Sequence, residues 1–208
     1  MPATMMHLYA GKQLLPQGSV SFFLGCILPD CVDAHREWKD HLHFRDVPPE
    51  NRLENIVLFG KALQLNEDFD FGTLCHFYLD YLWDNGPQRE HRLRHGEMNW
   101  FCDYRKELSC AGSRVAQRMA WSAPLWKRLE NPCASDYEGT LSFPEDELRA
   151  FLSFNARWHT QEALPQSKEF TDNLVDDFIQ GAVREFLAFF RQYFPEDYDA
   201  RKATLPPL

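Results

Sequence analysis

Apolar residues recur at helical spacing along most of the chain. The clearest amphipathic stretch runs from Phe170 to Phe190, where the apolar positions fall on one side of a helical wheel. Shorter apolar segments at residues 5–15 and 20–25 are followed by proline or glycine, which end or break helices. Since no convincing pair of strands is present, the pattern predicts an all-α protein, a single-domain multi-helix bundle.

The predicted bundle covers residues 1–194, and residues 195–208 are expected to form a polar, loosely held tail. Residues 100–119 are expected to be helical with a break near Gly112. The polar segment 31–48 is expected to be a solvated loop unless its residues belong to a site.

The stretch from Phe71 to Trp83 is apolar in every direction on a helical wheel, which indicates a buried helix. His76 and Asp80 interrupt it four residues apart, so their side chains share one face. Asp84 extends that face by another turn. We expect the other segments of the chain to be organised around this helix.

A buried imidazole and a buried carboxylate need partners, because an unpaired ionised group in the interior costs several kcal/mol. A metal ion is one partner for His76 and Asp80. A simple hydrogen bond between the two side chains, closing a gap in a helical core, is the other. On this motif alone both interpretations remain open.

The composition indicates a folded globular chain. Hydrophobic residues make up 44% and charged residues 25% of its 208 positions, and the formal net charge is −9. This charge disfavours binding to nucleic-acid backbones or anionic membrane surfaces. It leaves a phosphate-bearing substrate open, because a bound divalent cation reverses the local field.

Targeting signals and cysteine pairs are not evident. No apolar run approaches the ~20 residues that a membrane-spanning helix needs, and the first residues resemble no secretory signal. The six cysteines are scattered without Cys-x-x-Cys spacing. We therefore expect reduced thiols, no transmembrane segment and a cytoplasmic location.

Histidines are concentrated in the first half of the chain, with seven of the eight in the first 95 residues. This asymmetry predicts that the chemistry lies in the first half of the chain and that the second half supports it; any metal site is expected mostly from residues 1–84. His91 and His95 lie in a strongly charged segment and are expected to be exposed, and His159 is expected at the surface.

Four short stretches then form a recognisable series: Met6-His7-Leu8, Phe23 to Asp30 (FLGCILPD), His43-Phe44-Arg45, and Gly72-x3-His76-x3-Asp80-x2-Trp83. In this order and spacing they resemble the bacterial zinc-dependent phospholipase C family, and more distantly the S1/P1 nucleases. The resemblance covers roughly the first 85 residues of the chain.

The resemblance implies an all-α bundle that holds a zinc cluster at the mouth of a cleft. The positions that match the family's ligands are His7, Asp30, His43, His76 and Asp80. It further implies that Asp80 bridges two metals and that Asp30 is both a ligand and the general base. The implied activity is metal-dependent hydrolysis of a phosphate ester or a phospholipid head group, with one or two Zn²⁺ ions or other divalent metals.

The chain also departs from the family pattern. Asp84 stands near the position of a further histidine, and His159 and Glu162 are one residue closer than the family's last ligand pair. Asp84 and His41 are candidates for outer ligands or for groups that support the ligands. The alternative function is a non-catalytic helical protein, with a structural or vestigial metal site, that acts as a binding or scaffolding module.

Overall fold

The computed structural model describes residues 2–31, 36–96, 100–160 and 164–207. Within these ranges the chain forms α-helices and short 3-10 helices and no β-strand, which confirms the all-α prediction. The elements are α1 (Thr4–Leu14), α2 (Val20–Gly25), η1 (Leu28–Cys31), α3 (Arg36–Leu42), η2 (Pro49–Asn51), α4 (Arg52–Gly60), α5 (Asp68–Asn85), α6 (Pro87–His95), α7 (Trp100–Arg118), α8 (Ser122–Leu129), η3 (Ala134–Tyr137), α9 (Glu145–Thr160), α10 (Asp172–Tyr193) and α11 (Pro195–Arg201).

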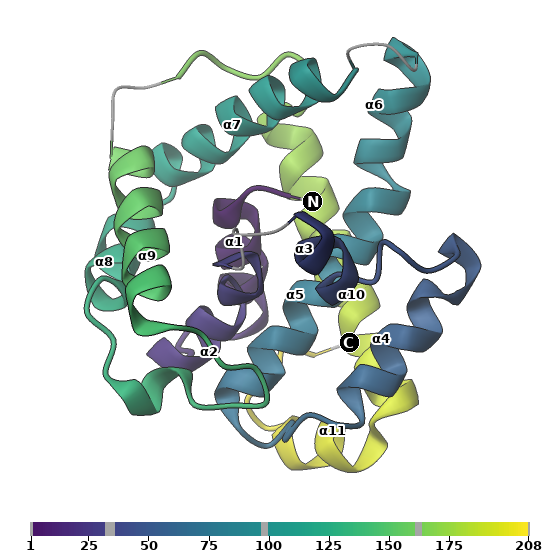
Figure 1. Cartoon of the computed structure of the whole chain (residues 1–208), viewed down its shortest axis with the longest axis vertical. Coiled ribbons are helices and arrows are strands. Elements are labelled where there is room, and N and C mark those ends of the chain that lie inside the picture. The colour runs from purple at the N-terminus through teal and green to yellow at the C-terminus, as the bar shows by residue number, and fades with distance from the viewer. Residues whose placement is uncertain (1, 32–35, 97–99, 161–163, 208) are drawn as a thin grey trace.

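Helix α5 runs through the middle of the bundle, with the other helices arranged around it (Figure 1). Its apolar side chains point in every direction and most of them are buried, as expected for a helix that is apolar all round. Phe71 contacts Phe186 and Phe190 of α10, with ring centroids 5.7 and 5.0 Å apart. On another side, the Trp83 indole donates a hydrogen bond to the Tyr104 hydroxyl of α7 over 2.8 Å.

Helices α2 and α5 cross with their backbones in direct contact. A Cβ atom at Gly72 would lie 2.2 Å from the Phe22 carbonyl oxygen, and one at Gly25 would lie 2.1 Å from that of Phe69. Only glycine permits this approach at either position. The crossing places the segment after α2, which carries Asp30, against the middle of α5.

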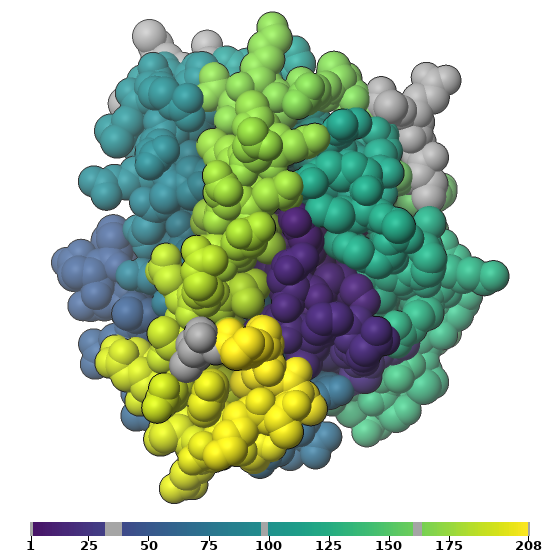
Figure 2. Space-filling view, turned by 180° about the vertical axis from the view of Figure 1, so that it is seen from behind, coloured from purple at the N-terminus to yellow at the C-terminus, as the bar shows by residue number. Residues whose placement is uncertain are grey.

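Helix α1 packs between α10 and α7, and Figure 2 shows its surface between theirs on the back of the molecule. One face of α1 therefore looks toward α5 and carries buried residues such as His7. Gly112 lies inside the continuous helix α7, so the expected break is absent. Glycine occurs there because a Cβ would lie 2.8 Å from that of Ala3.

The end of the chain is anchored to the body. The sequence suggests a loose tail after residue 194, whereas residues Pro195–Arg201 form α11. Arg201 is buried and donates to the carbonyl oxygens of Leu65 and Asn66 over 2.6 and 2.8 Å. Among the described residues, no helix has the length and apolarity needed to cross a membrane.

Candidate metal centre

The centre lies where α1, η1, the residues after α3 and α5 meet. On α5, His76 and Asp80 share one face as predicted, and both side chains are fully buried. The His76 Nε2 atom lies 4.0 Å from Asp80 Oδ2. Burial and the neighbouring His7 lower the pKa of His76 to about 3, so this imidazole is neutral at physiological pH.

The proton of His76 is fixed by the crossing of α2 and α5. Its Nδ1 atom lies 2.8 Å from the Cys26 carbonyl oxygen, which can only accept a hydrogen bond. Nδ1 therefore carries the hydrogen, and the lone pair is on Nε2, which points into the centre. A backbone carbonyl that orients a histidine in this way is typical of metal ligands.

His43 enters from the opposite side, immediately after α3. Phe44 follows it with a left-handed φ of 55° and packs against Phe59 and Phe77, with centroids 5.7 and 5.5 Å apart. His43 Nδ1 lies 2.7 Å from the Lys39 carbonyl oxygen, so in the neutral ring the lone pair is on Nε2. His43 is buried, and the interpretation of this segment as a solvated loop is wrong for this residue.

The two lone pairs meet inside the protein. His43 Nε2 lies only 3.1 Å from His76 Nε2. Two neutral rings in these tautomers place two acceptors face to face with no hydrogen between them. A cation between or beside the two atoms, either a metal ion or a proton, resolves this repulsion.

His7 and Asp80 complete one side of the centre. The His7 ring stacks on that of His76, with centroids 4.0 Å apart and an interplanar angle of 11°. Its Nε2 atom lies 3.3 Å from Asp80 Oδ1. Neither ring nitrogen of His7, nor Asp80 Oδ1, has a hydrogen-bond partner of good geometry among the described residues. Buried polar atoms in this condition are rare and call for a ligand or water.

Asp30 closes the other side, from the short helix η1. Its Oδ1 atom lies 3.5 Å from His43 Nε2 and 3.2 Å from Lys39 Nζ. Burial by itself would raise the pKa of Asp30, but the charge of Lys39 and the interaction with His43 hold it well below its ordinary value. Asp30 is therefore an ionised carboxylate beside the two facing imidazoles.

The donor set fits a metal ion. Two overlapping groups of ligand atoms each lie within 4.8 Å of one another: His7, His76 and Asp80, and Asp30, His43 and His76. Zinc binds imidazole nitrogen and carboxylate oxygen at about 2.0–2.2 Å, which places tetrahedral ligands roughly 3.4 Å apart. The separation of 3.1 Å between His43 and His76 and that of 3.3 Å between His7 and Asp80 match this spacing closely.

Two arginines, Arg45 and Arg52, form ion pairs with the carboxylates at the C-terminal half of α5. Arg45 Nη2 lies 2.6 Å from Asp80 Oδ2, and Arg45 Nε lies 3.1 Å from Asp84 Oδ2. Arg52 Nη1 also pairs with Asp84 Oδ2, at 2.8 Å. Asp84 therefore supports the site through Arg45. Burial would raise the pKa of Asp80, but Arg45 and the neighbouring histidines hold it well below its ordinary value.

The structure thus brings together His7, Asp30, His43, His76 and Asp80, which are spread over the first 80 residues. It does not bring His41 to them. The His41 side chain is 72% exposed and pairs with Asp46 over 2.7 Å. Glu162 lies outside the described residues.

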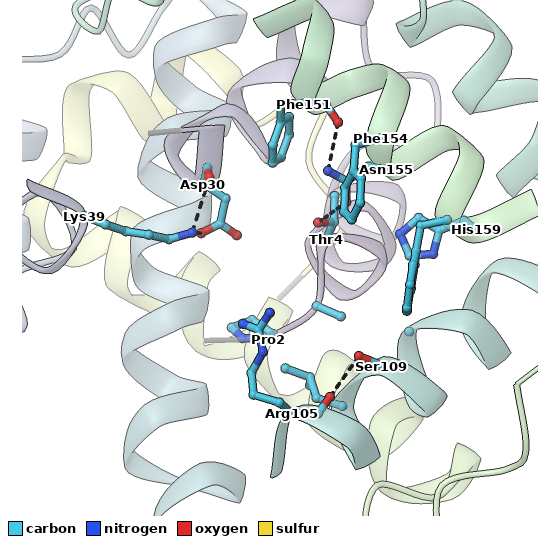
Figure 3. A pocket seen from close by; sticks show the side chains of 14 residues that line it. Pro2, Thr4, Asp30, Lys39, Arg105, Ser109, Phe151, Phe154, Asn155 and His159 are labelled. Carbon is cyan, nitrogen blue, oxygen red and sulfur yellow. Dashed lines mark hydrogen bonds and ion pairs between the residues drawn. The ribbon is translucent and has the colours of Figure 1, made fainter. Parts of the chain in front are cut away.

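A cavity of about 320 Å³ opens beside the centre. Figure 3 shows Asp30 and Lys39 on one side of it, Arg105 below, and Phe151 and Phe154 above. Asp30 is the one member of the centre that lines this cavity. The cavity therefore combines two cationic side chains, an apolar wall and a carboxylate of the candidate metal centre.

His159 also lines the cavity, and the expectation that it lies at the surface is wrong. Its ring stacks on Trp126, with centroids 5.7 Å apart, and its side chain is buried. The apolar stripe formed by Leu148, Leu152 and Ala156 of α9 predicts this orientation, because His159 follows at helical spacing. Sequence reasoning did not assign functional roles to Lys39, Arg45, Arg52 or Arg105.

No family model, curated protein or solved structure matches this chain. The resemblance to zinc-dependent phospholipases C therefore rests on the four short motifs.

Proposed function

We propose that this protein is a metal-dependent phosphoesterase that binds one or two divalent ions, zinc by preference, in the candidate metal centre. The observation that carries the proposal is that Asp30 belongs both to the candidate metal centre and to the lining of the cavity. Its carboxylate lies in a group of ligand atoms with His43 and His76, and it also lines the cavity. A substrate in the cavity would therefore meet the centre at Asp30.

The ligands proposed are His7, Asp30, His43, His76 and Asp80. Zinc in such a site supplies Lewis-acid chemistry to a phosphoryl group and lowers the pKa of a water molecule. The protein orients the Nε2 atoms of His43 and His76 toward the centre, because the Nδ1 atom of each ring donates a hydrogen bond to a backbone carbonyl. Preorientation of this kind raises the affinity for a metal.

The cavity supports an anionic substrate that also has an apolar part. Lys39 and Arg105 bring positive charge to its lining, whereas the chain as a whole carries −9. Phe151, Phe154 and Trp158 offer an aromatic surface. We propose that a phosphate ester with an apolar or aromatic substituent binds here, with Asp30 accepting the proton of the attacking water as general base.

The second candidate is a structural metal centre in a non-catalytic binding protein. The complete burial of His76 and Asp80 favours it, because open access is typical of catalytic ions. Arg45, moreover, already neutralises part of the charge of Asp80.

The test compares the wild-type protein with Asp30→Asn and with His41→Gln, the matched control on an exposed histidine. Each protein is stripped of metal, reloaded with Zn²⁺ and assayed on chromogenic aryl phosphomonoesters and phosphodiesters. We expect turnover only with metal, a loss of about a hundredfold or more in Asp30→Asn, and no change in His41→Gln. Metal-loaded protein that is inert on every ester, with Asp30→Asn affecting only the melting temperature, would support the structural alternative.

A further inference from the structure

A second group of ligand atoms lies beyond the C-terminal end of α5, on α6 and on the segment before α10. His91 and His95 are one turn apart on α6, and Glu169 lies just before α10. One potential ligand atom from each residue falls within 4.8 Å of the others. None of the three residues belongs to the centre described above, and none of them lines the cavity.

His91 is the unusual member of this group. The sequence around it is strongly charged and predicts exposure, but its side chain is completely buried. Neither of its ring nitrogens has a hydrogen-bond partner among the described residues. A buried imidazole without partners loses the hydrogen bonds it would make to water, which is unfavourable.

The aromatic rings around His91 hold its imidazole with Nδ1 directed toward Glu169. Tyr104 and Phe170 pack against the His91 ring, each with a centroid 5.7 Å away. The ring stacks on His95, with centroids 4.2 Å apart and an interplanar angle of 23°. Its Nδ1 atom faces Glu169 Oε2 at 3.7 Å, which is longer than a hydrogen bond.

Glu169 reaches both histidines with one carboxylate. Its Oε1 atom lies 3.3 Å from His95 Nε2. The His95 side chain is 34% exposed and the Glu169 side chain 22% exposed, so the group is open to solvent on one side. Two imidazoles one helical turn apart with a carboxylate opposite are a donor set for zinc and related transition-metal ions, and solvent can complete the coordination.

We propose that His91, His95 and Glu169 form a second, independent metal site, with a preference for imidazole-binding divalent ions such as Zn²⁺ or Ni²⁺. The ion would join α6 to the segment that leads into α10. It would also give the buried His91 the partner that the protein does not supply. The proposal does not depend on the phosphoesterase activity.

An ion-pair network is the competing explanation, because Arg94 Nη1 lies 2.9 Å from Glu169 Oε2. The two explanations predict different effects of removing the positive charge of Arg94 on metal binding. If the group is only an ion-pair network, Arg94→Gln weakens it and metal binding does not change. If the group is a metal site, Arg94→Gln removes a competing positive charge, and the affinity for the ion rises.

The experiment is calorimetric titration of metal-stripped, untagged protein with Zn²⁺ and separately with Ni²⁺, on the full chain. We expect His95→Gln and Glu169→Gln each to lower the stoichiometry by one ion per chain, or to weaken one class of site at least tenfold. We expect Arg94→Gln to strengthen that same class severalfold. The control His41→Gln should titrate as the wild type does. His95 is chosen over the buried His91 because its partial exposure makes a folding defect less severe.

Unchanged titrations of His95→Gln and Glu169→Gln would overturn the proposal. So would an Arg94→Gln protein that binds the ions no more tightly than the wild type. A His76→Ala variant separates the two sites, since it should lose binding at the first centre and keep the class of site that His95→Gln removes. Failure of the phosphoesterase assay leaves every one of these outcomes unaffected.

Discussion

His43 and His76 face each other through their Nε2 atoms at 3.1 Å, deep inside the bundle. The Nδ1 atom of each ring donates to a backbone carbonyl, so neither ring can turn to relieve the contact without losing a hydrogen bond. This relationship is the strongest physical argument that the centre holds a cation. Because the carbonyls hold both rings in place, the proposed ligand atoms are oriented before any ion binds.

Removal of Arg45 tests how the charges of the centre are balanced. Arg45→Gln leaves Asp80 and Asp84 with less positive charge nearby, and breaking a buried pair of this kind costs about 3–5 kcal/mol. We expect the metal-free variant to lose stability on that scale and Zn²⁺ to restore much of it. Urea unfolding with and without metal measures both effects.

The matched control is Arg149→Gln, because Arg149 pairs with Glu145 on the surface of α9. Exposed pairs contribute about 0–1 kcal/mol, so this variant should unfold almost as the wild type does. If Zn²⁺ stabilises Arg45→Gln no more than it stabilises the wild type, the positive charge of Arg45 does not balance Asp80 in the way described here.

The crossing of α2 and α5 should tolerate no side chain at Gly72. In Gly72→Ala the new Cβ would lie 2.2 Å from the Phe22 carbonyl oxygen, so the helices must separate. We expect a loss of about 2–4 kcal/mol of stability and weaker metal binding, since Asp30 follows α2. Gly181→Ala on α10 is the control, because its Cβ meets no atom within 4 Å. It should stabilise the protein by about 0.5–1 kcal/mol.

His159 should make the stability depend on pH. Burial lowers the pKa of His159 from 6.5 to about 4 in the folded protein. Between these values the unfolded chain takes up a proton that the folded chain does not, so stability falls as the pH drops from about 6.5 to 4, by up to ~3 kcal/mol. In metal-free protein, His159→Gln should lose less stability over this range than the wild type. Urea unfolding of both proteins at pH 7 and pH 4.5 measures this loss of stability. Equal losses in the two proteins would contradict the predicted role of His159.

The central helix and its site face could be predicted because the signals are local. An all-apolar wheel interrupted by His76 and Asp80 already indicates burial with a shared face. Gly72 is part of the motif around His76, but only the structure shows that α2 approaches it closely.

The ion pairs around Asp84 and the burial of His91 depend on contacts between distant segments, which the local sequence pattern does not indicate. Arg45 and Arg52 meet Asp84 only because α3, α4 and α5 come together. His91 is buried inside a charged helix, since Tyr104 and Phe170 from distant segments cover it. No periodic pattern within α6 could reveal this, because its remaining residues are at least partly exposed.

Metal analysis of the purified protein tests the central claim most directly. The chain is expressed without a tag, purified without added metal, and examined by elemental mass spectrometry beside the double variant His43→Ala/His76→Ala. The account predicts that the wild type holds at least one more divalent ion per chain than the double variant does, and that His41→Gln holds as many as the wild type. Equal metal contents in the wild type and the double variant, both as purified and after addition of Zn²⁺, would contradict the account. The facing imidazoles would then share a proton.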